Sequence, residues 1–390
     1  MSSALFVALV VPALAAVHYY VWRRVVRDTT APGSRPRRAG TALLVLLGVL
    51  LVAAPPAESA LPKPLAVTVG WPGFLWMAGI LYLCFALLVA EAVRPFLLRA
   101  ARRGTPDGTV PDPSRRLFVN RSLALAAGAA TAATVGYGAA TALGPPTIKH
   151  LTVPLARLDP RADGFRIAVV SDIHLNSLAG RARARQISDL VNGTRPDLIA
   201  VVGDLVEDAD VAELGPEVAP LARLSAPHGA YFVTGNHEHY SGARQWIDFV
   251  RQLGLRPLVN ERVALPGFDL AGVTDASGTE EGLGPDYGAA LDGRDPGRAV
   301  VLLAHQPVQV HEAVKHGVDL QLSGHTHGGQ LWPFNHLSRL ANPAVAGLHR
   351  FGDTLLYVTR GTGFWGPPVR LGADPDITVV TLAAPRTSPS

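Results

Sequence analysis

Cysteine is nearly absent from this chain of 390 residues. The single cysteine, Cys84, lies within an apolar run. A single cysteine excludes an intramolecular disulfide, so cysteine spacing carries no information about the redox compartment. Internal repeats and low-complexity segments are also absent from the sequence. The length suggests two or three units of ordinary domain size.

Acidic residues are scarce in the first part of the chain. Residues 1–150 contain 15 Lys and Arg but only 5 Asp and Glu, a net charge of +10. Residues 151–390 contain the remaining 20 basic and 26 acidic residues, a net charge of −6. The basic pI of 9.4 therefore belongs to the first part, and a basic nucleic-acid-binding domain is not expected.

Long apolar runs are plentiful instead. Hydrophobic residues make up 48% of the chain, and the mean hydropathy of +0.22 is high for a soluble protein. Four runs are each long enough to cross ~30 Å of hydrocarbon as a helix. Buried core helices are the alternative, but four successive runs without an amphipathic pattern favour a membrane region over residues 1–145. The expected spans are 4–22, 39–57, 65–90 and 122–143.

Arginines in the connecting segments predict an orientation. Six lie between the first two expected spans and seven follow the third, whereas the segment between the second and third has only Glu58 and Lys63. Arginine-rich segments stay in the cytoplasm. The pattern predicts a multi-pass protein of the cell membrane, with the residues after the fourth span outside the cytoplasm.

From about residue 150, short β-type runs alternate with helical stretches. Apolar strands joined by helical crossovers indicate a sheet covered on both faces, so we expect an α/β domain over 150–384 and a loose tail over 385–390. One helix is expected to end near Gly193 and another to begin with Ser241 as its N-cap. The expected strands are 165–171, 197–203, 230–235, 269–275, 299–305, 318–324, 354–360 and 376–382.

Polar residues follow five of these strands at the point where each ends. Carboxyl ends of strands in open α/β sheets converge on one crevice, where ligands bind. Carboxylate, amide and imidazole groups together suit a pair of divalent cations. Each motif alone also fits an ordinary turn or a core histidine, but their shared position favours ligands. The candidates are Asp172, His174, Asp204, Asn236, His237, His305, His325 and His327.

Other polar residues of this region receive simpler interpretations. Arg370 either contacts an anionic substrate or is an ordinary surface or packing arginine. The remaining histidines are expected to be surface or structural residues. They are His228, His239, His311, His316, His336 and His349.

The segments DIH, GDLVED, GNHE, AHQP and GHTHGGQ resemble the five blocks of the calcineurin-like metallophosphoesterases, over about residues 165–382. GHTHGGQ and the later RGTGFWGPPVRLGADPDITVVTL resemble the membrane-associated YkuE/YaeI-type branch, which includes transmembrane proteins with an attached phosphoesterase domain. The resemblance implies a four-layer α/β/β/α sandwich with mixed sheets. It also implies two divalent metal ions, Mn²⁺, Zn²⁺ or Fe²⁺.

The same resemblance implies a role for each candidate residue. Asp204 would bridge the two metals, and His237 would serve as proton donor or transition-state stabiliser. Glu207 and Asp208, which meet the family's carboxylate position, are not counted as ligands. Asp172, His174 and His327 would hold the first metal, and Asn236, His305 and His325 the second.

The implied function is a membrane-anchored phosphoesterase with a metal-activated water. A relative of the branch cleaves the pyrophosphate of a UDP-diacylglucosamine lipid, so a lipid-linked nucleotide pyrophosphatase is one alternative, and a generic phosphodiester or monoester is equally allowed. The expected substrate is a phosphorylated small molecule or a phospholipid-like molecule. A non-catalytic membrane sensor or scaffold is the alternative of another class. The complete ligand set favours the enzyme.

Residues 114–119, SRRLFV, resemble the twin-arginine export signal, and the span that follows is rich in Ala and Gly. The alternative is an arginine cluster that only fixes the topology of an ordinary transmembrane helix. Ligands from five loops form a site only in a folded domain, so export after folding would let the cytoplasm choose the metals. The hypothesis makes the twin-arginine export machinery a partner of this chain.

Replacing Arg115 and Arg116 with Lys tests this hypothesis. Lysine keeps the positive charge that fixes topology but removes the arginine pair that the export route reads. We expect the domain beyond the fourth span to become protected from protease added to intact spheroplasts. Digestion as fast as in the parent protein would show that the pair is a topology signal alone.

Overall fold

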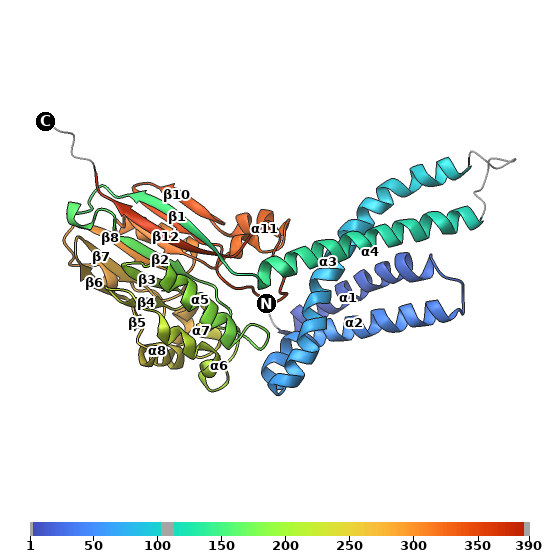
Figure 1. The fold of residues 1–390 in the computed structure, drawn as a ribbon, viewed down its shortest axis with the longest axis horizontal. Coiled ribbons are helices and arrows are strands. Elements are labelled where there is room, and N and C mark those ends of the chain that lie inside the picture. Colours follow the sequence, from blue (N-terminus) through green and yellow to red (C-terminus); the bar gives the residue numbers. More distant parts are fainter. Residues whose placement is uncertain (1–2, 103–112, 386–390) are drawn as a thin grey trace. The chain divides into compact units, whose positions relative to one another are not determined.

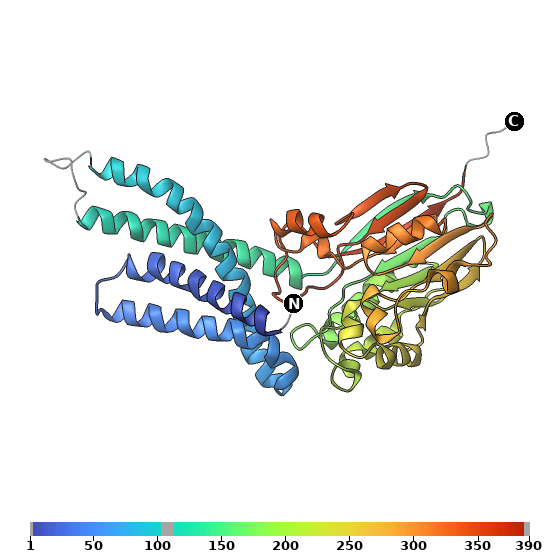
Figure 2. The same cartoon turned by 180° about the vertical axis from the view of Figure 1, so that it is seen from behind.

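The computed structural model describes residues 3–102 and 113–385, and the chain divides into two compact units, Met1–Ala140 and Thr141–Ser390 (Figures 1 and 2). The first unit is helical, and every strand of the described chain belongs to the second. The tail predicted at 385–390 lies outside the described residues except for its first position.

The first unit contains the apolar helices that the sequence predicts. Within the described residues, α2, α3 and α4 are long and apolar enough to cross a membrane. The span expected at 4–22 coincides with α1 and stays a prediction. The bounds are α1 (Ser3–Val21), a π-helical stretch (Trp22–Arg27), α2 (Arg35–Ala60), α3 (Lys63–Arg102) and α4 (Pro113–Leu143).

Two contacts contribute to the packing of this unit. At Gly73 of α3 an added Cβ would lie 2.4 Å from the carbonyl oxygen of Leu50, so only glycine lets α2 and α3 approach this closely. Arg24 places its Nε 2.7 Å from Glu91 and its Nη1 3.0 Å from Asp28. The arginine-rich end of the first helix is thus partly neutralised by paired carboxylates.

The second unit is built on two six-stranded sheets. In the first sheet, β2 to β5 run parallel, β12 is antiparallel to β2, and β1 is parallel to β12. The sheet is therefore mixed. Its order is β1 (Thr147–Pro154), β12 (Asp376–Ala383), β2 (Arg166–Val170), β3 (Leu198–Val202), β4 (Ala230–Val233) and β5 (Arg256–Pro257).

The second sheet is also mixed. Its four inner strands, β11, β9, β8 and β7, run parallel, and the two edge strands are antiparallel to their neighbours. The order is β10 (Gly347–Phe351), β11 (Thr354–Val358), β9 (Leu320–Ser323), β8 (Ala299–Leu303), β7 (Phe268–Gly272) and β6 (Glu261–Leu265).

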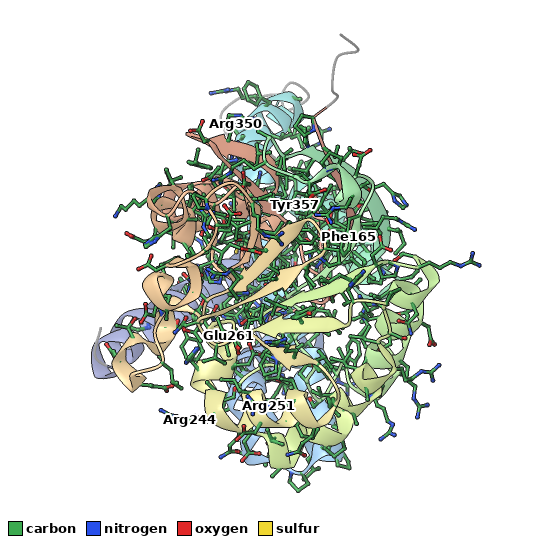
Figure 3. The ribbon with its side chains drawn as sticks, turned by 90° about the vertical axis from the view of Figure 1, so that its left-hand side faces the viewer. Phe165, Arg244, Arg251, Glu261, Arg350 and Tyr357 are labelled. Carbon is green, nitrogen blue, oxygen red and sulfur yellow. The ribbon has the colours of Figure 1, made fainter. Side chains whose placement is uncertain are left out.

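The main core lies between the two sheets. Side chains alternate along each strand, so Ile167 and Val169 of β2 belong to the inter-sheet cluster, whereas Ala168 and Val170 belong to the cluster on the outer face. Phe165 and Tyr357, labelled in Figure 3, are also members of the inter-sheet cluster. Because both faces of each inner strand are buried, most of these strands read as apolar runs, with a few buried polar residues such as Asp269 of β7 and Gln321 of β9.

Helices cover the outer face of each sheet and complete the predicted four-layer α/β/β/α sandwich. Helices α5, α6 and α8 pack on the first sheet, and α9 and α10 on the second. The bounds are α5 (Arg181–Gly193), α6 (Val211–Val218), α7 (Asn236–Tyr240), α8 (Ala243–Gln252), α9 (Tyr287–Leu291), α10 (Val310–Lys315) and α11 (Phe334–Ala341). Short 3₁₀ turns are Pro160–Ala162, Ala219–Arg223, Ala276–Glu281, Pro307–Gln309 and His327–Gly329.

The strands that the sequence did not predict are the four edge strands, β1, β5, β6 and β10. An edge strand has a neighbour on one side only, and three of these four alternate or stay partly exposed instead of forming an apolar run. The fourth, β5, has only two residues. An apolar-run criterion therefore finds inner strands and misses edges.

The expected N-cap at Ser241 is wrong. Helix α8 begins at Ala243, its N-cap is Gly242 with φ of 94°, and no side chain caps it. Ser241 instead ends α7, where its hydroxyl donates to the carbonyl of His237 at 2.7 Å. Ser241 caps the end of the short helix α7 instead of the start of α8, and the local sequence pattern does not predict α7.

Candidate metal centre

The structure brings all eight candidate residues together at the carboxyl ends of five strands. They follow the inner strands β2, β3 and β4 of one sheet and β8 and β9 of the other. Donor atoms fall into three groups, each within 4.8 Å: Asp172, His174 and His327; His174, Asp204 and His237; and Asp204, His305 and His325. Asn236 lies next to the third group, because its Oδ1 is 2.9 Å from Nδ1 of His325.

Backbone strain is concentrated in these residues. Eight non-glycine residues of the described chain have positive φ, and five of them are candidate ligands. Such a conformation costs about 1–3 kcal/mol per residue and persists where the surrounding fold over-determines it. The five are Asp172, His174, Asp204, His325 and His327, with φ of 51°, 47°, 54°, 73° and 51°.

Two glycines let the loops close around the carboxylates. A Cβ at Gly235 would lie 2.1 Å from Oδ1 of Asp204, and a Cβ at Gly324 would lie 2.3 Å from Oδ2 of Asp172. Neither distance is compatible with a side chain. The glycines of GNHE and GHTH are therefore required by close approach.

Asp204 occupies the central position. Its Oδ2 lies 3.0 Å from Nε2 of His305 and 3.6 Å from Nε2 of His174, while its Oδ1 accepts the backbone N–H of His237 at 3.0 Å. Burial opposes ionisation, but the imidazoles of His305 and His174 hold the pKa of this carboxyl far below its usual range. One oxygen of a charged carboxylate thus faces both ligand groups.

The tautomer of His305 follows from its surroundings. Its Nδ1 lies 2.8 Å from the carbonyl oxygen of Val202, which only accepts, so Nδ1 carries a proton. In the neutral ring Nε2 then presents a lone pair to the Asp204 carboxylate at 3.0 Å. Two facing electron-rich atoms repel unless a cation lies between them. Burial disfavours the imidazolium, yet Asp204 raises the pKa of His305 well above its usual value.

The first ligand group also brings imidazoles into close contact in a buried setting. Nε2 of His174 and Nε2 of His327 lie 3.0 Å apart, and Oδ2 of Asp172 is buried without a hydrogen-bond partner. Burial, reinforced by neighbouring imidazoles and Arg370, holds the pKa of both histidines well below the usual value, which keeps them in the neutral, metal-binding form. Burial also raises the pKa of Asp172 to about 6.

These observations test whether the residues fit metal ions. The groups are mostly buried and combine imidazole, amide and carboxylate ligands, and Oδ2 of Asp172, Nδ1 of His174 and Nε2 of His305 have no hydrogen-bond partner in the described part of the chain. Divalent Mn, Zn or Fe accepts such a mixed set. The residues present therefore fit a pair of divalent cations.

His237 has a partner that the sequence interpretation set aside. Its Nδ1 lies 2.8 Å from Oδ1 of Asp208. Burial opposes the charged ring, but the hydrogen bond with Asp208 and the charges of Asp204, Asp208 and Glu207 together raise the pKa of His237 to about 9. Asp208 holds the ring through Nδ1 and orients it, a role that its position beside Glu207 alone does not reveal.

Glu238, the last residue of the GNHE segment, also has a role that the sequence does not reveal. Its carboxylate accepts the backbone N–H groups of Asp204 at 2.9 Å, Leu205 at 2.7 Å and Gly235 at 2.7 Å. The side chain is fully buried, and burial together with the Asp204 charge raises its pKa to about 7. Glu238 therefore ties the loop after β3 to the loop after β4.

Arg370 and Asp275 complete the surroundings of the centre. Arg370 is fully buried and donates to the carbonyls of Gly363 at 2.7 Å and Arg360 at 2.8 Å, which favours the packing alternative. Its Nη2 also donates to Nδ1 of His327 at 3.1 Å, so it packs directly against a candidate ligand. Asp275 follows the β7 run and accepts from the amide of Gln306, next to His305, at 2.9 Å. The position of Asp275 after a sixth strand was visible in the sequence, but Asp275 was not predicted to be a site residue.

Comparison with known proteins agrees with this geometry. Residues 165–329 match the calcineurin-like phosphoesterase family. The chain is 36% identical over 324 residues to a transmembrane protein with metallophosphoesterase domain from Bos taurus, covering 79% of this chain and 72% of that protein. It is 36% identical to an uncharacterized metallophosphoesterase of Helicobacter pylori over 64% of this chain and 68% of the relative.

The uncharacterized metallophosphoesterase YkuE of Bacillus subtilis is 35% identical over 282 residues, which cover 69% of this chain and 97% of that protein. The bovine match extends well beyond the 165 positions of the family match, since it includes 79% of the chain. The chain therefore belongs to the calcineurin-like metallophosphoesterases, alongside the transmembrane and YkuE-type proteins of that family.

Proposed function

We propose that this protein is a membrane-anchored phosphoesterase that uses two divalent metal ions to hydrolyse phosphate ester or anhydride bonds. The observation that carries the proposal is the position of Asp204 Oδ2, 3.0 Å from His305 and 3.6 Å from His174. A carboxylate between two imidazole groups is the arrangement that one anion shared by two cations requires.

Each of the seven proposed ligands has a place in this scheme. Asp204 is the shared ligand, and the two sets on either side supply three donors each. Two bound metals would lower the pKa of a water and neutralise phosphate oxygens. Asn236 contributes a neutral oxygen, which keeps the centre positive enough to attract a phosphate anion. The sets are Asp172, His174 and His327 on one side and Asn236, His305 and His325 on the other.

His237 supplies the proton chemistry in this proposal. Its Nδ1 is held by Asp208 at 2.8 Å, which leaves Nε2 as the proton donor to the leaving oxygen. The backbone N–H of His237 donates to Asp204 Oδ1 at 3.0 Å, so the ring and the shared ligand are fixed relative to each other. The residue is only 7% exposed, which limits competing contact of its ring with water.

Membrane attachment and enzymatic turnover are the finer parts of the proposal. The apolar helices α2, α3 and α4 support attachment, and the bovine relative is named a transmembrane protein. We infer a multi-pass protein with its phosphoesterase domain outside the cytoplasm, as the arginine distribution predicts.

A metal-exchange assay on the full chain in detergent tests the function. After removal of metal by a chelator, we expect no hydrolysis of bis(p-nitrophenyl) phosphate, p-nitrophenyl phosphate or a lipid pyrophosphate. Addition of Mn²⁺, Zn²⁺ or Fe²⁺ should restore turnover of at least one of them. Two bound metals per chain without turnover of any ester or anhydride would instead support the non-catalytic sensor or scaffold.

Asp204→Asn tests the shared ligand. The substitution keeps the shape of the side chain and its acceptor for His237 but removes the charge between the two sets. Loss of an outer-shell partner typically costs ~10–100-fold, so we expect a larger loss of turnover together with a lower metal content. The matched control is Asp248→Asn, a carboxylate on α8 that is 67% exposed. Near-normal turnover at equal metal content would contradict the two-metal assignment.

Asp208→Asn and His237→Ala separate proton transfer from metal binding. We expect both variants to keep the parent's metal content. His237→Ala should lose ~10²–10⁴-fold in rate, as removal of a general acid typically does. Asp208→Asn should lose less, because the ring remains but is oriented less well, and both losses should be greatest for poor leaving groups. Glu213→Gln, on an exposed side chain of α6, is the control, and a collapse of metal content in His237→Ala would make His237 a ligand.

A further inference from the structure

Helix α11 presents its apolar side chains to the outside. Leu337 is 58% exposed and Leu340 85% exposed, and Phe334 is exposed as well. The polar residues Asn335 and Ser338 of the same helix are only partly exposed, while His336 and Arg339 are exposed beside the leucines. A surface helix of a soluble domain has the opposite arrangement, with its apolar stripe toward the core.

Two tryptophans extend this apolar surface. Trp332, just before α11, is 57% exposed, and Trp365, in the loop after β11, is 56% exposed. Gln330 joins the two segments, since its amide donates to the carbonyl of Trp365 at 2.8 Å and its Oε1 accepts the backbone N–H of Trp365 at 3.0 Å. We call Trp332, Phe334, Leu337, Leu340 and Trp365 the apolar rim.

The apolar rim adjoins the loops of the metal centre. A Cβ at Gly329, two residues after His327, would lie 2.3 Å from Cα of Asn335, so α11 packs directly on the backbone of the loop that carries this ligand. Gly363, two residues before Trp365, donates its N–H to the carbonyl of Asp172 at 2.8 Å. Whatever the rim contacts is thereby held beside the catalytic centre.

The charges around α11 differ from those of the rest of the domain. Between Asp319 and Asp353 the sequence has no acidic residue, whereas Arg339 and Arg350 are both exposed. Residues 151–390 as a whole have a net charge of −6. An apolar surface flanked by arginines, on an otherwise acidic domain, is suited to a layer of phosphate headgroups above hydrocarbon.

The connection to the membrane region is short. Helix α4 ends at Leu143 and β1 begins at Thr147, and the intervening three residues reach at most about 10 Å when fully extended. If α4 spans a membrane, the phosphoesterase domain therefore stays at that membrane surface. Exposed tryptophans are enriched at this depth, because their rings are apolar and their N–H groups are polar.

We propose that the apolar rim inserts into the interface of the membrane that carries α4, so that the metal centre acts on the phosphate groups of lipids in that bilayer. This inference rests on the proposed function, both for the membrane anchor and for the hydrolysis. The substrate class is then a membrane lipid whose phosphate ester or anhydride lies at headgroup level. Burial of Leu337 and Leu340 in acyl chains would remove the exposed apolar surface that the isolated domain retains.

A spin label on Leu340 tests the insertion without reference to activity. The full chain, with Cys84→Ser, is reconstituted in nanodiscs of phosphatidylethanolamine and phosphatidylglycerol, and Leu340→Cys is compared with Arg251→Cys on exposed α8. We expect the label at 340 to be relaxed by oxygen, which concentrates in lipid, and the label at 251 by a water-soluble nickel chelate. Equal access of the nickel chelate to both labels, or shielding of position 340 from both reagents by protein, would overturn the proposal.

Turnover of two esters with one chromophore tests the substrate class. Leu340→Asn should leave hydrolysis of soluble bis(p-nitrophenyl) phosphate unchanged and reduce, by at least fivefold, hydrolysis of diacylglyceryl p-nitrophenyl phosphate in phosphatidylglycerol vesicles. Val314→Asn, an exposed apolar residue of α10, should change neither rate. Equal effects on both esters would contradict the inference. Absence of all turnover would contradict the proposed function instead, and the spin-label ratio would then decide whether the rim inserts.

Discussion

The interaction on which the site depends is the approach of Asp204 Oδ2 to two imidazole nitrogens, at 3.0 Å for His305 and 3.6 Å for His174. The proton of His305 is on the opposite ring nitrogen, against the carbonyl of Val202. In the neutral ring Nε2 would face the carboxylate with a lone pair, and, although burial opposes the charged ring, the Asp204 charge accordingly raises the pKa of His305 well above its usual value. The carboxylate thus favours positive charge at Nε2, either a proton or a metal ion.

The scaffold holds these groups in place by rigid means. Inner strands buried on both faces fix the points at which the loops begin. Left-handed backbone at five candidate ligands turns each loop sharply toward the centre. Glu238 then joins two of the loops through three backbone N–H groups. Positioning from several strands of two sheets gives a geometry that no single loop would maintain.

The same loops connect the centre to the rest of the chain. Arg183 of α5 donates to the carbonyls of Gly144 and Thr362, both at 2.6 Å. Thr362 in turn donates its backbone N–H to the carbonyl of Ser171, the residue before Asp172. The segment that follows α4 is therefore linked through one buried guanidinium and Thr362 to the residue before a candidate ligand. Trp365 of the apolar rim lies in the same loop as Thr362.

Much of the fold follows from local sequence. Inner strands have both faces buried, so β2, β3, β4, β8 and β11 are almost wholly apolar runs, and the layer order follows from the alternation of strands with helices. Candidate ligands were recognisable because each follows such a run directly, as Asp172 follows β2. The edge strands were not predicted because pairing on one side only leaves them partly polar. The predicted N-cap at Ser241 was wrong because the neighbouring helix α7 uses its hydroxyl.

Contacts between distant segments decided the remainder. Asp208 pairs with His237 across 29 positions, and Glu238 reaches back 34 positions to Asp204. Neither partnership leaves a local pattern, because hydrogen-bond geometry is set by how the loops fold together. The packing role of Arg370 and the outward apolar face of α11 depend likewise on what surrounds them. The sequence by itself determined which residues have the chemistry for metal binding and which strands carry them. Only the tertiary structure decided which of them meet, because convergence of five loops is a property of the packed sheets.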